Sequence, residues 1–222
     1  MNELSRPDDE PLRFGTEPFY ASLGRAFVVM CAVVPVLFLI QLLDFATPYS
    51  LAQAGGIAPK RIDGVDGILF APFLHANFAH LYANSIPLIL LGTFVLASGM
   101  RRFLWSTGLI MLVSGVGVWI VGASGTVHVG ASGVIFGYLG LLLTRGIVER
   151  SWWNIAVGIL IGMLYWWQLF GILPGQEPIS WEGHLFGFVG GAVAAILFRR
   201  RRPRPAGGTG PDIILPDFRL PR

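Results

Sequence analysis

The tetrapeptide Gly-Ala-Ser-Gly at 130–133 puts a serine between two glycines at the start of an apolar run, 134–143. From Ser132 to the end of that run beside Arg145, a helix would be about 20 Å long. The hydrocarbon core of a bilayer is about 30 Å thick. If Arg145 lies at one membrane surface, Ser132 lies roughly 10 Å below the other. Irregular backbone at that depth requires a protein interior or a water-filled cavity, so we expect a hydrated serine inside a membrane.

A serine hydroxyl becomes an effective nucleophile when a base takes its proton. His184, about one turn inside the last apolar segment, is the candidate base and later the acid for a leaving amine. Phe136 follows Ser132 by four residues, which puts both on one helix face, and we expect its ring to stack on the imidazole. We expect no carboxylate within the spans to orient the histidine. The pattern therefore predicts a serine–histidine dyad.

An acyl-transfer intermediate also needs hydrogen-bond donors for its oxyanion. His80 and Asn84 are four residues apart and share a helix face, and His75 precedes them at the helix entrance. Together with the backbone N–H of Ser132 at its helix N-terminus, they are the candidate donors. Each polar residue alone could simply hydrogen-bond to a neighbouring helix. Because polar residues within spans are rare and all of these lie at one inferred level, a shared cavity is the better interpretation.

Glycines at helical spacing predict how the two dyad helices meet. Gly187 and Gly191 share the face of His184. The segment after Ser132 contains three more glycines: Gly133, Gly137 and Gly140. Small residues let membrane helices approach closely, so the hydroxyl and the imidazole are expected within hydrogen-bond reach.

Gly-Ala-Ser-Gly also occurs at 122–125, which makes Ser124 a competing nucleophile. That copy follows an apolar span instead of starting one, and the residues after it favour extended chain. We therefore assign the nucleophile to Ser132 and interpret His128 as a loop histidine. A nucleophile elbow is excluded because Val134 occupies the place of its last glycine.

Metal chemistry has little support in the sequence. The H-E-x-x-H pattern of zinc proteases is absent. A site built from the three histidines 75, 80 and 184 would lack a carboxylate or cysteine partner. The single Cys31 also excludes a disulfide framework and a cysteine-rich metal site. We expect neither a metal nor another cofactor.

The composition indicates an integral membrane protein. Of 222 residues, 54% are hydrophobic and 13% are charged, against about 25% charged in soluble domains. The apolar residues form long blocks. The net charge of +3 comes from arginines beside these blocks, which reflects membrane topology and not nucleic-acid binding.

The apolar blocks predict six spans in an all-α, multi-pass membrane domain. They cover residues 26–43, about 78–100, 103–121, a short span beginning at 132, about 151–170 and 182–198. We expect a flexible cytoplasmic tail at 1–25, a membrane domain at 26–198 and a basic, Pro/Gly-rich cytoplasmic tail at 199–222. The alternative for the first span is a cleavable signal peptide. Arginines at alternate connections put both termini in the cytoplasm and open the serine toward the outer face.

Three short motifs occur together in one chain: His75-x4-His80-x3-Asn84, Gly130-x-Ser132-Gly133 and His184-x2-Gly187-x3-Gly191. In this order they resemble the signature of the rhomboid intramembrane serine proteases, over about residues 26–198.

The resemblance implies a rhomboid-like six-helix bundle in a bacterial cell membrane, with a short central fourth helix carrying the serine. It implies hydrolysis of peptide bonds in or near the transmembrane segments of membrane-protein substrates. Ser132 would be the nucleophile, His184 the base, His80 and Asn84 the oxyanion donors, and His75 their neighbour. The fifth helix and the loop 171–181 would form the substrate gate and cap. A tyrosine often stacks on the catalytic histidine in this family, and Phe136 stands in its place.

Two other functions fit parts of the pattern. A rhomboid-like pseudoprotease would bind transmembrane clients without cutting them, but the chain retains both the serine and the histidine of the dyad. A transporter or channel would place paired charges along a continuous path, and the inner halves of these spans are apolar.

Overall fold

The computed structural model describes residues 15–150, 152–164, 166, 172–173 and 180–199. Within these ranges the regular secondary structure is helical, apart from one isolated β-bridge between Ile57 and His128. The longer helices are α1 (Glu17–Ala46), α4 (Phe78–Ala97), α5 (Met100–Val121), α6 (Ser132–Val148), α7 (Trp152–Leu164) and α9 (Trp181–Leu197). Four short helices lie between α1 and α4: α2 (Leu51–Gly55), η2 (Ile62–Gly64), α3 (Gly67–Phe70) and η3 (Ala71–Phe73).

Three of the described helices are long and apolar enough to cross a membrane: α1, α4 and α5. The helices α6 and α9 and the segment 155–164 are apolar but shorter. The all-helical class is therefore confirmed for the described residues, and the count of six spans stays a prediction. The expected cap at 171–181 lies largely outside the described residues, as do residues 1–14 and 200–222 of the two expected tails.

The helix α1 begins at Glu17, where the apolar run alone predicted a start at residue 26. Pro18 lies in the first turn, where its missing N–H costs no hydrogen bond. Phe19 is buried, and its ring packs edge-on against Trp153 of α7, with 6.3 Å between the centroids. This aromatic contact extends the helix into the polar N-terminal segment, because a tertiary contact can outweigh local composition.

The helix α6 continues to Val148, past the expected end at residue 144. Arg145 was expected to mark a membrane surface, but its side chain is buried in the protein. One guanidinium nitrogen donates to Ser98 Oγ at 3.0 Å, and another lies 4.0 Å from the Glu149 carboxylate. Because the buried Arg145 side chain has these partners within the bundle, it does not mark a membrane surface, and the inferred depth of Ser132 stays a prediction.

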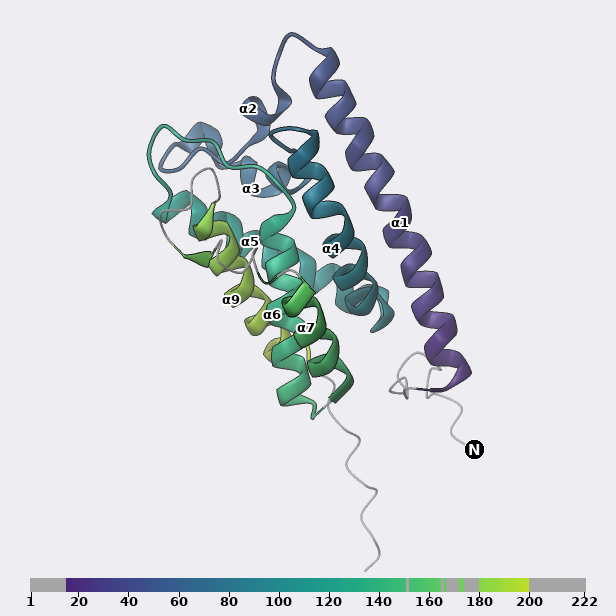
Figure 1. The fold of residues 1–222 in the computed structure, drawn as a ribbon. Helices are drawn as coiled ribbons and strands as arrows, with labels where there is room; N and C mark the ends of the chain where they lie inside the picture. Colours follow the sequence, from purple (N-terminus) through teal and green to yellow (C-terminus); the bar gives the residue numbers. More distant parts are fainter. Residues whose placement is uncertain (1–14, 151, 165, 167–171, 174–179, 200–222) are drawn as a thin grey trace, which may run out of the picture.

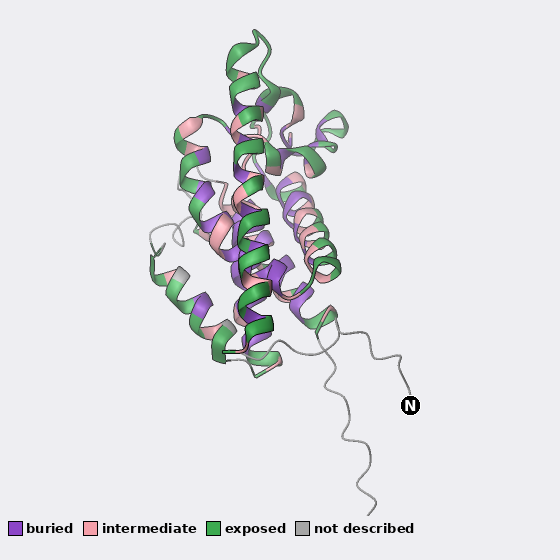
Figure 2. Ribbon diagram, turned by 90° about the vertical axis from the view of Figure 1, so that its right-hand side faces the viewer, coloured by how far each residue is buried: buried purple, intermediate pink, exposed green. Residues whose placement is uncertain are grey.

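The helix α6 packs most extensively on α9 and also contacts α4, α5 and α7. The long helix α1 lies along α4 (Figure 1). Many of its large hydrophobic side chains are exposed. Buried residues concentrate where the helices face one another, and exposed residues cover the outer faces (Figure 2). Many of these outer residues are large hydrophobics, as a lipid-facing surface requires.

Glycines allow the α6–α9 contact, as the sequence predicted. A Cβ atom at Gly187 would collide with the carbonyl oxygen of Gly133, and one at Gly191 with that of Gly137. A Cβ at Gly140 would collide with the carbonyl of Phe188. The two backbones therefore touch over about two turns, and only glycine fits at these positions.

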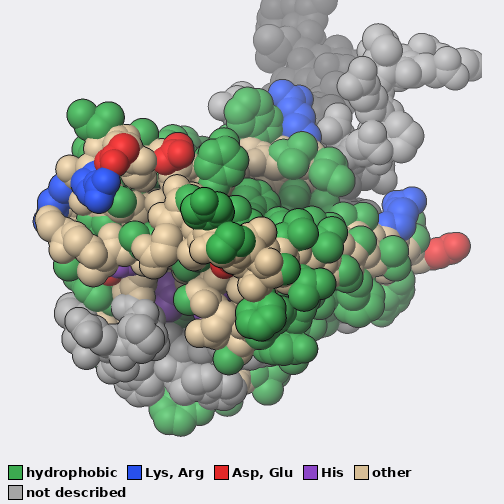
Figure 3. All heavy atoms as spheres, turned by 90° about the horizontal axis from the view of Figure 1, so that it is seen from above, with side chains coloured by type: hydrophobic (Ala, Val, Ile, Leu, Met, Phe, Trp, Pro, Cys, Tyr) green, Lys and Arg blue, Asp and Glu red, His purple; other side chains and the backbone are tan. Residues whose placement is uncertain are grey.

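The segment between α1 and α4 packs onto the C-terminal half of α5. Ile68 lies against Gly115 of α5: a Cβ atom added at Gly115 would be 2.7 Å from Cγ2 of Ile68. Ala71 accepts a hydrogen bond from the backbone N–H of Gly130 at 2.9 Å. Seen from this end of the molecule, histidine side chains are visible in a recess of the surface (Figure 3). The segment thus supports the turn that leads into α6.

Candidate active site

The turn before Ser132 is held by backbone and histidine contacts. Gly130 has a φ of +122°, a conformation that residues with a Cβ rarely adopt. The next backbone N–H, that of Ala131, points at His75 Nε2 at 3.5 Å. Ser132 is the first residue of α6 and is partly exposed. Its hydroxyl therefore lies at a helix N-terminus. The turn before it is held by the hydrogen bonds of Gly130 to Ala71 and of Ala131 to His75.

His80 and Asn84 of α4 lie against the same turn. A Cβ atom at Gly130 would be 2.8 Å from His80 Nε2 and 3.5 Å from Asn84 Nδ2. Asn84 is buried, and its Nδ2 has no hydrogen-bond partner among the residues that the structure describes. An amide donor in this position is available to an oxygen that develops charge beside Ser132.

His75 completes this group from the loop before α4. Its ring lies edge-on to that of His80, with 5.2 Å between the centroids. Burial, and to a lesser degree the neighbouring His80, lowers the pKa of His75 to about 3, while a backbone hydrogen bond to Phe73 opposes the shift. A neutral His75 can accept through Nε2, which matches the direction of the Ala131 N–H.

His184 reaches the site from the first turns of α9 and is buried. Its imidazole stacks on the ring of Phe136, with 4.1 Å between the centroids and 15° between the planes. This confirms the stacking expected from helical spacing. Phe136 follows Ser132 by about one turn, so both lie on the same face of α6. The stack therefore places the His184 ring against the helix face that carries Ser132.

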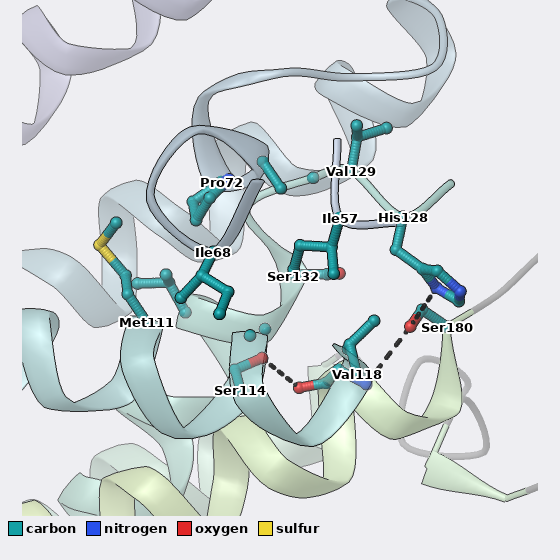
Figure 4. A pocket seen from close by; sticks show the side chains of 16 residues that line it. Ile57, Ile68, Pro72, Met111, Ser114, Val118, His128, Val129, Ser132 and Ser180 are labelled. Atoms are coloured by element: carbon teal, nitrogen blue, oxygen red, sulfur yellow. Dashed lines mark hydrogen bonds between the residues drawn. The ribbon is translucent and has the colours of Figure 1, made fainter. Parts of the chain in front are cut away.

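A cavity of about 40 Å³ adjoins Ser132 (Figure 4). Its lining combines apolar side chains, among them Ile68 and Val118, with the hydroxyls of Ser114, Ser132 and Ser180. Such a volume can hold a water molecule, and the hydroxyls supply polar partners for it. Ser132 thus lies beside a small, mostly apolar recess that contains hydroxyl groups, and a water-filled cavity at membrane depth stays a prediction.

Sequence reasoning missed several polar residues near Ser132 and His184. Ser114 of α5 donates to the carbonyl of Gly183 at 2.8 Å, next to His184. Glu182 is buried in the first turn of α9, which corrects the expectation that the spans hold no carboxylate. Ser180 caps α9 by accepting from Gly183 N–H at 3.3 Å. A serine directly before an apolar helical run with an acidic residue in its first turn is an N-cap signal that could have identified Ser180.

Ser124 and His128 lie in the loop between α5 and α6, as expected. Ser124 is exposed and does not line the cavity. His128 does line it, and its ring bonds to Ser180. No group of three His, Cys, Asp or Glu side chains that could hold a metal occurs in the part of the chain that the structure describes.

These features define a helical membrane protein in which a serine and a histidine lie on two touching helices. A family model described as a Rhomboid domain matches residues 64–201, more than half of the chain. The chain therefore belongs to the rhomboid family, and it is an integral membrane protein.

Similar proteins occur in other organisms. The uncharacterised protein Rv1337 of Mycobacterium tuberculosis is 43% identical over 207 residues, which cover 88% of this chain and 85% of that protein. YdcA of Bacillus subtilis, named provisionally as a rhomboid protease, is 29% identical over 174 residues, 72% of this chain and 77% of its own. RHOMBOID-like protein 4 of Arabidopsis thaliana is 28% identical over 158 residues, which cover 67% of this chain and 38% of that protein. No solved structure matches the chain.

Proposed function

We propose that this protein is an intramembrane serine endopeptidase that hydrolyses peptide bonds in or near the transmembrane segments of other membrane proteins. The observation that carries the proposal is the stack of Phe136 on His184, one helical turn from Ser132. It supports a dyad in which the Ser132 hydroxyl attacks the peptide carbonyl and His184 takes the hydroxyl proton. His184 then returns that proton to the leaving amine, and water releases the acyl group.

In this mechanism the oxyanion accepts hydrogen bonds from Asn84, His80 and the backbone N–H of Ser132. Support comes from the position of both side chains against Gly130, two residues before the nucleophile. The Asn84 amide is a donor whose Nδ2 has no other partner among the described residues. Donors already in place need no reorganisation when charge develops on the substrate oxygen.

A substrate helix must be unwound before its carbonyl can meet the hydroxyl. We therefore expect substrates with small or helix-breaking residues near the cleaved bond. No cofactor takes part in this chemistry. We also propose six spans with both termini in the cytoplasm, on the grounds of arginine distribution. Ser132 then opens toward the outer face of a bacterial cell membrane.

The test is covalent labelling with a fluorophosphonate, together with cleavage of a model transmembrane substrate in liposomes. The variants are Ser132→Ala and the matched Ser124→Ala from the second Gly-Ala-Ser-Gly. We expect Ser132→Ala to lose labelling and cleavage, and Ser124→Ala to keep both. A Ser132→Ala protein that still cleaves would refute the proposal. A wild type that binds the substrate and never cleaves it would favour a pseudoprotease.

A further inference from the structure

His128 connects three segments of the chain beside the dyad. Its backbone N–H and carbonyl pair with Ile57 at 2.9 Å each, which ties the α5–α6 loop to the segment before α4. Its ring Nδ1 lies 2.8 Å from Ser180 Oγ, at the start of α9 (Figure 4). His128 precedes Ser132 by four residues, and Ser180 precedes His184 by four. One side-chain bond therefore joins the segments that lead into both residues of the dyad.

The hydroxyl groups around the ring assign its tautomer. Thr126 Oγ1 donates its proton to the carbonyl of Ala123 at 2.7 Å. The 2.8 Å contact between Thr126 Oγ1 and His128 Nε2 then requires the proton to be on Nε2. Neutral His128 consequently accepts at Nδ1. The Ser180 hydroxyl donates to it at 2.8 Å, a shorter contact than the 3.4 Å to the Glu182 carboxylate. The imidazole is thus oriented from both sides.

Ser180 transmits this contact to the helix that carries His184. Its Oγ accepts from the N–H of Gly183 at 3.3 Å, and its carbonyl accepts from the N–H of His184 at 3.3 Å. A side chain that caps a helix fixes the first turn, because it satisfies donors that have no partner within the helix. The position of that turn determines the position of the His184 backbone, and so the place from which its side chain extends.

We propose that His128 is a positioning residue for the Ser132–His184 pair, and that it acts through Ser180 as a hydrogen-bonded latch between the α5–α6 loop and the start of α9. The inference rests on the proposed function for its effect on catalysis. Its effect on the order of α9 does not depend on that function. His128 itself need not touch the substrate.

The latch should respond to pH. Burial lowers the pKa of His128, and the neighbouring Glu182 opposes the shift. Glu182 is the charged group that acts on the ring from α9, and Ile57, the partner from the facing segment, carries no charge. An opened latch exposes the ring and restores its ordinary pKa, near 6.5. Because the opened form then binds a proton more readily, acidification from pH 7 toward pH 5 favours opening.

The experiment compares wild type, His128→Ala, His128→Asn and the exposed loop control Ser124→Ala in liposomes. Asparagine can reproduce the bond at Nδ1 because its side-chain oxygen can accept from Ser180. We expect His128→Ala to lower kcat about tenfold with little change in KM, as loss of one orienting bond predicts. His128→Asn should recover most of that rate, and Ser124→Ala should match wild type. Adding Ser180→Ala to His128→Ala should lower the rate by less than Ser180→Ala does alone, because the two residues share one bond.

Hydrogen exchange of residues 180–190 tests the latch independently of activity. His128→Ala should raise exchange in this segment, and His128→Asn should restore protection. After correction for intrinsic rates, wild-type exchange should rise from pH 7 to pH 5 by more than that of His128→Asn, which lacks the His128 imidazole. Unchanged exchange and an unchanged kcat in His128→Ala would overturn the latch. A wild type without cleavage would overturn the proposed function, and the exchange data would still decide whether His128 orders α9.

Discussion

The imidazole of His184 lies flat on the ring of Phe136, with 4.1 Å between the centroids and 15° between the planes. The two residues belong to α9 and α6, so the stack fixes the rotation of one helix relative to the other. It also limits the rotamers that His184 can adopt, because the ring is held on one face. The orientation of the proposed base is therefore a property of the helix contact.

Replacing Phe136 tests this stacking. Phe136→Tyr preserves the ring and should keep activity within about threefold of wild type, whereas Phe136→Leu should lower kcat by about tenfold. The loss corresponds to the roughly 0.5–1.5 kcal/mol that an aromatic pair contributes beyond burial. Initial rates of substrate cleavage, measured with thermal unfolding of the same samples, separate misorientation from instability. Equal rates for the tyrosine and leucine variants would show that stacking is not required.

Gly187 tests the close approach of α6 and α9. Gly187→Ala places a Cβ against the carbonyl of Gly133 and should destabilise the protein by about 1–3 kcal/mol, the usual cost of overpacking. Gly108→Ala is the matched control, because a Cβ there meets no atom within 4 Å and alanine favours the helix. Thermal unfolding in detergent should show a lower midpoint for the first variant and an unchanged or higher one for the second. Equal midpoints would contradict the contact.

Gly130 tests the turn before the nucleophile. Both Gly130 and Gly125 have a positive φ, so alanine is strained at either position. Only at Gly130 does the added Cβ also meet a side chain, at 2.6 Å from the ring of His80. Gly130→Ala should therefore reduce labelling of Ser132 by at least about tenfold, and Gly125→Ala should leave it close to wild type. Similar labelling of the two variants would assign the effect to backbone strain alone.

Asn84→Ala tests the proposed oxyanion donor. Loss of one such donor costs about 100-fold or more in kcat in other hydrolases, with little effect on substrate binding. The control is Ser85→Ala on the same helix, because its buried hydroxyl bonds only to the carbonyl of Leu81 at 2.7 Å in the described structure. Steady-state kinetics should show a fall in kcat for the first variant and none for the second. A change confined to KM would instead place Asn84 in substrate binding.

His75 predicts how stability varies with pH. Its pKa is about 3 in the folded protein and 6.5 when unfolded, so between these values the unfolded chain binds the extra proton. Stability should therefore fall as pH is lowered from 6.5 toward 3, and this contribution is fully present above pH 6.5. Thermal midpoints of wild type and His75→Asn across this range should show a shallower slope for the variant. Parallel curves would exclude His75 as a source of the dependence.

The sequence allowed the prediction of the helical class and of every residue in the proposed dyad and oxyanion group. The helical class is confirmed for the described residues, whereas the roles of the dyad and oxyanion residues stay predictions. Both kinds of inference depend on local spacing. Ser132 and Phe136, or His80 and Asn84, share a face wherever a helix forms. Glycines at intervals of four likewise indicate which face another helix approaches. Such patterns are visible in the order of residues alone.

The sequence alone could not show which distant side chains meet. Arg145 looked like a membrane boundary, yet in the fold it is buried beside Ser98, because two helix ends converge there. The prediction that the spans hold no carboxylate overlooked Glu182, and His128 was interpreted only as a loop histidine. The bond from His128 to Ser180 crosses 52 positions of the chain. Only the packing of α9 against α6 brings such residues together, since no local periodicity encodes a contact between segments that far apart.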